Sequence, residues 1–231
     1  MPHKPDDSVP LTLFGPDDAS ESESDLPELQ PAQVTEAVVT ATDWTTETII
    51  AQLRRGNINL KPAFQRRDAW TDTRKSKFIE SLFLGLPVPQ IVLAERKDKR
   101  GSFLVIDGKQ RLLTLMQFAA NSPDSEFRPL RLRGLEIKRD LNGKTLCDIA
   151  DNGDLAEDLN AFHNQTIRTV VVKNWPSEDF LYLVFLRLNT GSVALSPQEL
   201  RQALHPGPFV EFADDCMQQS GALRSLHSWR T

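Results

Sequence analysis

Apolar residues recur at helical spacing along much of this chain, and short apolar or β-branched runs stand between the helical stretches. Where Ser or Thr precedes a helical stretch and Gly follows it, the sequence also marks the two ends of the helix. Helices are predicted from Thr45 or Thr46 to Gly56, from Thr71 to Gly85, from Lys109 to Ala120, over residues 145–150 and 155–162, from Ser177 to Gly191, and from Ser196 onward. The helix after Ser177 is expected to bury Phe180, Leu181, Val184, Phe185 and Leu188.

Five runs have the composition of β-strands, namely residues 57–60, 91–94, 103–106, 132–137 and 166–172. A charged stretch from Glu95 to Arg100 separates the second run from the third, which predicts a β-hairpin with a solvated turn. This mixture of elements predicts an α+β fold, with a small sheet and packed helices followed by additional helices.

The first 36 residues differ from the rest because they are rich in Pro, Ser, Asp and Glu and show no apolar period. They predict a disordered acidic leader with a local charge of −8, whereas residues 37–231 carry +3. One alternative is that the leader mimics nucleic acid and covers a basic groove. We expect one domain over residues 37–206, and a C-terminal helical extension over residues 207–231 whose end the sequence does not mark as natural. A charge of +3 suits a phosphate-bearing partner but falls short of a dedicated DNA-binding face.

The stretch from Ser102 to Ala120 predicts a strand, a tight turn at Asp107-Gly108, and a helix. Backbone N–H groups and the positive end of the helix dipole meet at such a junction, and Lys109 and Arg111 add formal positive charge there. The turn therefore predicts an anion site. On these residues alone, an ordinary junction with a solvated basic first turn remains open as the alternative.

Two other segments supply cations, amides and carboxylates beside abrupt turns. The first is Gln65-Arg66-Arg67, which lies between Phe64 and Trp70. The second runs from Arg187 through Asn189 to Glu199 and Arg201. We expect the three segments to meet at a phosphate site, where Arg66 and Arg111 bind phosphate oxygens and Asp107 holds a metal ion or orients a water. The residues expected to contact phosphate are Gln65, Arg66, Arg67, Gly108, Lys109, Gln110 and Arg111.

Several classes of protein are disfavoured by what the sequence lacks. No Gly-rich Walker-type loop occurs, which argues against a P-loop nucleotide fold. Cys147 and Cys216 stand in no metal-ligand spacing, which argues against a zinc site and favours a reducing, cytoplasmic location. No stretch approaches the roughly 20 apolar residues of a membrane span, so no membrane partner is expected.

Four motifs in order carry a resemblance to a known family: FQRR with a following Trp, SLFLGLPVPQI, VIDGKQRLLTL, and FLRLNTGSVALSPQELRQAL. Together they resemble the N-terminal domain of the GmrSD-type modification-dependent restriction enzymes. The resemblance implies a ParB/sulfiredoxin-like fold with a Gln-Arg loop and an Asp-Gly-Gln-Gln-Arg motif, in which Lys109 replaces the first Gln. It places Gln65, Arg66, Asp107, Gly108, Gln110 and Arg111 in the nucleotide or phosphate site, and it matches Asn189 and Glu199 to the later motif.

The function that this resemblance implies is binding and hydrolysis of a nucleoside triphosphate, GTP or ATP, with Mg²⁺, in a DNA restriction and phage-defence system. Longer members continue into a His-Asn-His nuclease domain, so DNA cleavage is expected from a nuclease partner or from a further domain. Two alternatives remain open. One is a non-catalytic nucleotide or DNA sensor that uses the same turn, and the other is a metal-dependent DNA nickase with Asp107 and Glu199 as its carboxylates. The oligomeric state is left open.

Overall fold

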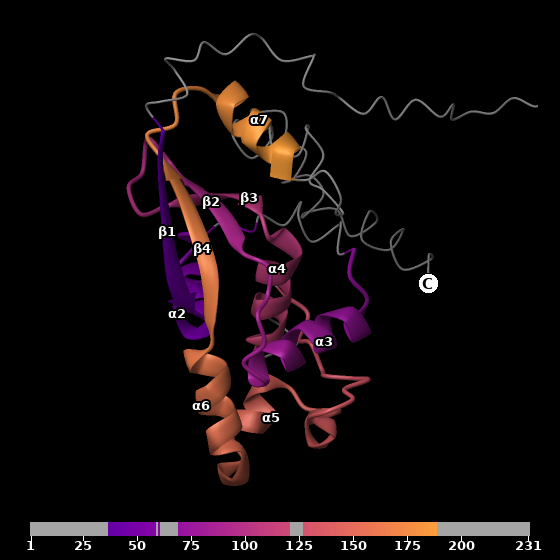
Figure 1. The fold of residues 1–231 in the computed structure, drawn as a ribbon. Coiled ribbons are helices and arrows are strands. Elements are labelled where there is room, and N and C mark those ends of the chain that lie inside the picture. Colours follow the sequence, from indigo (N-terminus) through magenta and orange to yellow (C-terminus); the bar gives the residue numbers. More distant parts are fainter. Residues whose placement is uncertain (1–36, 59, 61–68, 121–126, 189–231) are drawn as a thin grey trace, which may run out of the picture.

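A computed structural model describes residues 37–58, 60, 69–120 and 127–188 of the chain. Its strands are β1 (Val38–Thr45), β2 (Ile91–Glu95), β3 (Phe103–Asp107) and β4 (Thr166–Lys173). Its α-helices are α2 (Thr46–Arg54), α3 (Asp72–Phe83), α4 (Lys109–Phe118), α5 (Leu146–Ala150), α6 (Ala156–Asn164) and α7 (Glu178–Leu188), and two 3₁₀ turns are η3 (Arg139–Leu141) and η4 (Gly153–Leu155). The predicted α+β class is confirmed (Figure 1).

The four strands form one mixed sheet in the order β1-β4-β2-β3. β1 and β4 are antiparallel, β2 and β4 are parallel, and β2 and β3 are antiparallel. The predicted hairpin of residues 91–94 and 103–106 is therefore confirmed, and it forms the edge of the sheet opposite β1.

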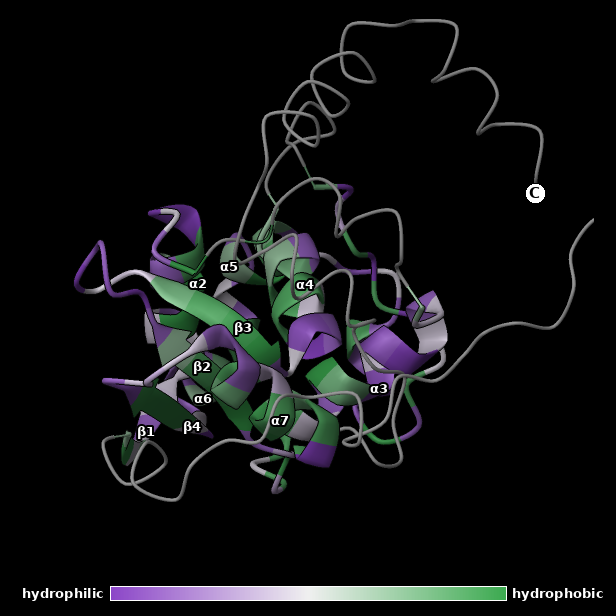
Figure 2. Cartoon of the chain, turned by 90° about the horizontal axis from the view of Figure 1, so that it is seen from above, coloured by the Kyte–Doolittle hydropathy of each residue, from purple (hydrophilic) through white to green (hydrophobic). Residues whose placement is uncertain are grey.

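The two faces of the sheet pack against different helices because successive strand residues point to opposite sides. Ile91 and Leu93 of β2 join the larger hydrophobic core, in which Phe83 of α3, Phe118 of α4 and Phe162 of α6 are in ring contact. The alternate residues of the strands, such as Val92, Ala94 and Ile106, form a second core with Phe180, Leu181 and Phe185 of α7. In Figure 2 hydrophobic colour predominates on β3, whereas α3 and α4 each carry hydrophobic and hydrophilic turns.

Two of the predicted helix starts are confirmed in detail. The hydroxyl of Thr45 accepts a hydrogen bond from the backbone N–H of Thr48 at the start of α2, and the hydroxyl of Thr71 accepts one from that of Arg74 at the start of α3. Both are N-cap contacts, which satisfy backbone donors that have no acceptor within the helix.

Two predicted strands are wrong. In residues 57–60 the pairing is a single bridge between Ile58 and Phe103, and Asn59 lies outside the described residues. Residues 132–137 form no strand because their N–H groups meet side chains of α3 and a turn: Ser76 accepts from Arg133, and Glu80 accepts from Ile137.

Two further differences concern exposure at the margins of the fold. Leu188, expected to be buried, is 40% exposed because α7 ends there. Strand β1 has no counterpart among the predicted strands. As the edge strand it leaves Val38 and Val39 exposed, so it lacks the alternation of buried and exposed positions that marks a half-buried strand.

Candidate functional site at the start of helix α4

Asp107 ends β3 beside a β-bulge. Val92 is paired with Asp107 and Leu93 with Val105, which leaves Ile106 as the extra residue on β3. Val105 faces the larger core, and an unbroken alternation would turn Asp107 toward that same core. The bulge redirects the strand at this point, and the Asp107 side chain is 29% exposed.

Gly108 makes the turn from β3 into α4 with a φ of +95°, in the left-handed region that favours glycine. A Cβ at this position would lie 3.1 Å from Cγ1 of Ile91 and 3.3 Å from Nη2 of Arg111. The Gly108 carbonyl also accepts the first helical hydrogen bond of α4, from the N–H of Leu112 at 2.9 Å. Backbone conformation and close packing therefore both require glycine here.

Arg111 ties this turn to the start of β2. Its Nη2 donates to Oδ2 of Asp107 at 2.9 Å and to the backbone carbonyl of Gln90 at 2.9 Å. The Arg111 side chain is only 13% exposed, so the pair lies in a partly desolvated position where its geometry is well defined. Arg111 thus holds the Asp107 carboxylate in place. The Gln90 carbonyl was missed by sequence reasoning, because backbone acceptors carry no signal in residue type.

Lys109 and Gln110, the first residues of α4, lie where the sequence placed them. Lys109 is 8% exposed, which is unusual for a lysine. The Gln110 carbonyl accepts from the hydroxyl of Thr114, which is itself fully buried. The first turn of α4 is therefore anchored from within the helix.

The start of α4 differs electrostatically from every other α-helix start in the described residues. The first turns of the other five contain acidic residues, whose negative charge interacts favourably with the positive end of the helix dipole. These residues are Glu47 in α2, Asp72 in α3, Asp148 in α5, Glu157 and Asp158 in α6, and Glu178 and Asp179 in α7. The first turn of α4 contains no acid, and no side chain caps it. The carboxylate of Asp107 precedes the helix and is paired with Arg111. Among the described α-helices, α4 is thus the one whose first turn carries cations and no acid, an arrangement that suits an anion site.

The meeting of three segments stays a prediction. Gln65, Arg66, Arg67, Asn189, Glu199 and Arg201 lie outside the described residues. Arg187 is exposed in the last turn of α7, and α7 packs against β3, the strand that ends at Asp107.

The described residues contain no group of three or more His, Cys, Asp or Glu side chains that could hold a metal ion by themselves. Asp107 is a single carboxylate, so it suits a metal that takes its other ligands from phosphate oxygens and water, as Mg²⁺ commonly does. None of the helices in the described part of the chain is long and apolar enough to cross a membrane.

Fold and site together define a mixed α+β domain with a candidate anion site where an edge strand passes into a helix. Residues 47–206 match the family model described as the GmrSD restriction endonuclease, N-terminal domain, and the chain belongs to that family. The domain is thus a component of a restriction and phage-defence system. Comparison with curated proteins and with solved structures gave no match.

Proposed function

We propose that this domain binds a nucleoside triphosphate at the turn from Asp107 to Arg111 and hydrolyses it, in a restriction system that cleaves DNA through a nuclease partner or a further domain. The observation that carries the proposal is the start of α4, where Gly108 replaces a capping side chain and cations replace the usual acid. Helix starts of this kind bind phosphate groups through backbone N–H donors and the helix dipole.

The proposed reaction is attack of water on the γ-phosphorus, with cleavage of the bond to the β-phosphate oxygen, giving a nucleoside diphosphate and phosphate and releasing a proton. In this reaction Asp107 orients the water or a metal-bound phosphate, and its contact with Arg111 keeps the carboxylate in position. When bound with the triphosphate, Mg²⁺ would neutralise part of the phosphate charge, with Asp107 as its protein ligand. The family resemblance adds Gln65 and Arg66 as further phosphate contacts.

A phosphate-release assay with GTP and with ATP in the presence of Mg²⁺ tests the proposal. Asp107→Asn is expected to lower turnover by about 100-fold or more, because a positioned acid–base group contributes that much to a rate. Asp43→Asn is the matched control: Asp43 also pairs with an arginine, Arg168, at 3.2 Å, but on β1 and with both partners exposed. Equal turnover in the two variants, or a wild-type protein that releases no phosphate from either nucleotide with DNA and nuclease present, would contradict the proposal.

A second candidate function is a sensor that binds nucleotide without hydrolysing it. The observation in its favour is the ion pair of Asp107 with Arg111, which commits the carboxylate to a structural contact. Isothermal titration with GTP, ATP and a non-hydrolysable analogue separates the two candidates. The sensor would bind the nucleotide and its analogue equally well and release no phosphate.

A further inference from the structure

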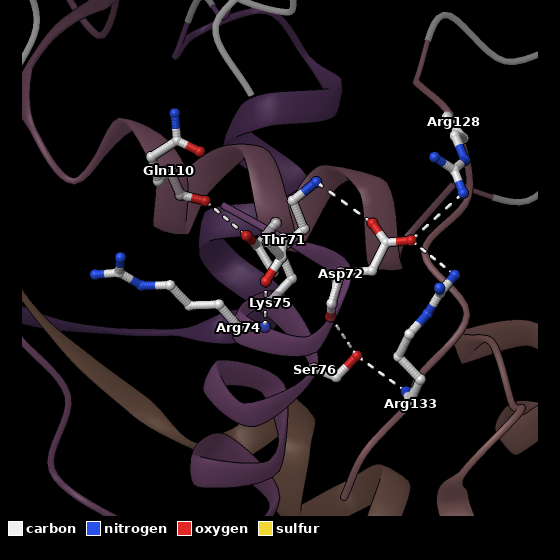
Figure 3. A network of polar contacts seen from close by, with 9 residues as sticks. Thr71, Asp72, Arg74, Lys75, Ser76, Gln110, Arg128 and Arg133 are labelled. Carbon is white, nitrogen blue, oxygen red and sulfur yellow. Dashed lines mark hydrogen bonds and ion pairs between the residues drawn. The ribbon is translucent and has the colours of Figure 1, made fainter. Parts of the chain in front are cut away.

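A cluster of cations surrounds the first residue of α3, outside the turn described above. The carboxylate of Asp72 lies 2.7 Å from Nη2 of Arg133, 3.4 Å from Nη2 of Arg128 and 3.9 Å from Nζ of Lys75 (Figure 3). One negative charge is thus shared among three positive charges. The two arginines reach Asp72 from the segment that follows residues 121–126, far from α3 in the sequence.

The Ser76 hydroxyl joins the backbone of Arg133 to the backbone of Asp72, which fixes the position of the arginine-bearing segment on α3. The hydroxyl of Ser76 accepts from the backbone N–H of Arg133 at 3.0 Å and donates to the carbonyl of Asp72 at 2.7 Å. Leu130 and Leu132, which lie between the two arginines in the sequence, are buried in the larger core. The arginine side chains themselves face solvent: Arg128 is 77% exposed and Arg133 is 56% exposed.

A fourth cation lies on the other side of the helix start. The guanidinium of Arg74 lies over the ring of Trp70, 4.7 Å from the ring centroid. In Figure 3 Arg74 points away from Asp72, while Arg128 and Arg133 lie on the opposite side of Asp72. The positive charge therefore extends across the start of α3 and is wider than a single small anion needs.

We propose that Arg74, Arg128 and Arg133, which surround Asp72, form a docking surface for the phosphate backbone of DNA. Arginine binds phosphate oxygens in a bidentate manner, and a row of separated cations matches a polymer that carries a phosphate at every step. Both arginines are exposed and Asp72 is 22% exposed, so a phosphate can take the place of the carboxylate as their partner. The surface deepens the function proposed above, and it depends on that function only for the choice of DNA over RNA.

Its position links it to the candidate nucleotide site. The surface lies on α3, which is in contact with α4, the helix that begins at the candidate site. DNA bound across the start of α3 would consequently lie on a helix that packs against α4.

Fluorescence anisotropy with a labelled 20-base-pair duplex and the full chain, without nucleotide, tests the surface. Arg128→Gln combined with Arg133→Gln is expected to weaken binding about 10-fold or more and to lower the slope of log K against log salt concentration by about 1.8, or about 0.9 for each phosphate that is no longer neutralised. The matched control is Arg96→Gln combined with Arg168→Gln, which removes the same charge from exposed arginines paired with Asp98 and Asp43. The control is expected to bind as the wild type does.

Asp72→Asn supplies a test in the opposite direction. It removes the competing carboxylate, so binding is expected to become several-fold tighter and its salt dependence steeper. Thermal melting of each variant shows whether its fold is intact. Equal weakening in the arginine pair and its control, weaker binding by folded Asp72→Asn protein, or tighter binding of a single-stranded RNA 20-mer than of the duplex would overturn the proposal.

The outcome of the DNA-binding experiment does not depend on whether the nucleotide proposal is correct. The Arg128→Gln/Arg133→Gln variant is expected to release phosphate from a nucleoside triphosphate at the wild-type rate when no DNA is present. If the wild type releases none, the proposed hydrolysis is wrong while anisotropy still decides the docking surface.

Discussion

Helices α3 and α4 pack against each other but begin in opposite ways. At the start of α3, the Thr71 side chain accepts a hydrogen bond from a backbone N–H, and the negative charge of Asp72 interacts favourably with the helix dipole. At the start of α4, Gly108 offers no capping side chain, and Lys109 and Arg111 bring positive charge to an end that is already positive. The first arrangement stabilises a helix, and the second does not.

The difference separates a helix start that is stabilised by a cap and an acid from one that has neither. Substitution of a capping residue costs about 0.5–2 kcal/mol, and a charge of the wrong sign at a helix end costs a further few tenths to about 1 kcal/mol. Local rules of this kind are broken mainly where function requires it. The ion pair of Arg111 with Asp107 and the close packing of Gly108 on Ile91 are the contacts that compensate.

The largest effect in this comparison is expected from alanine at Gly108. Its φ of +95° strains any residue with a Cβ, and the added atom would lie 3.1 Å from the buried Ile91 side chain. We expect Gly108→Ala to lower the free energy of unfolding by about 2–3 kcal/mol, measured by urea denaturation.

Gly143→Ala is the matched control for that substitution. Gly143 has a similar φ of +82°, but an added Cβ would meet no atom within 4 Å. It should cost only the backbone strain, about 1–2 kcal/mol. Equal losses at the two glycines would show that close packing adds nothing at the start of α4.

A smaller effect is expected at the start of α3. Thr71→Ala removes the hydroxyl that accepts from Arg74 at 3.3 Å and should lower stability by about 1 kcal/mol. Because Thr71 acts on the helix alone, nucleotide affinity measured by titration should stay at the wild-type value. Thr71→Ser, which keeps the acceptor, should restore most of the stability. A loss of nucleotide binding in folded Thr71→Ala protein would contradict the claim that Thr71 stabilises α3 without contributing to nucleotide binding.

The smallest effect concerns a third helix start, that of α5. Asp148 completes a capping box, and its pKa is lowered first by the hydrogen bond from the backbone N–H of Thr145, then by the Thr145 hydroxyl and by nearby Arg131. A lowered pKa in the folded state means stability that is present above about pH 4 and is lost as the pH falls through the folded pKa.

Asp148→Asn should therefore cost little at pH 7, about 0.3 kcal/mol for a half-exposed acid at a helix start, and nothing at pH 2. Denaturation curves at the two pH values measure the difference. Asp154→Asn, on the exposed turn η4, serves as the control. A cost that persists at pH 2 would show that the carboxylate charge is not what stabilises this start.

Much of the fold and the core of the candidate site were predictable from residue order. Thr71 before Phe78 and Ile79, and Asp107-Gly108 between a strand and a helix, are local signals, and the structure places these residues as predicted. Strand β1 was missed because an exposed edge strand shows no alternation of polar and apolar residues. Residues 132–137 were misassigned because the Ser76 and Glu80 side chains, 57 positions away, accept hydrogen bonds that would otherwise require a neighbouring strand.

The sequence by itself determined the order of most elements and the cationic turn at Asp107-Gly108, because helix caps, turn glycines and apolar periods act over a few residues. Only the tertiary structure decided that Arg111 donates to both Asp107 and the carbonyl of Gln90, and that Arg128 and Arg133 share Asp72 on α3. The contacts of Arg111 with Gln90 and of both arginines with Asp72 join segments that are separated in the chain, so local sequence patterns do not reveal them.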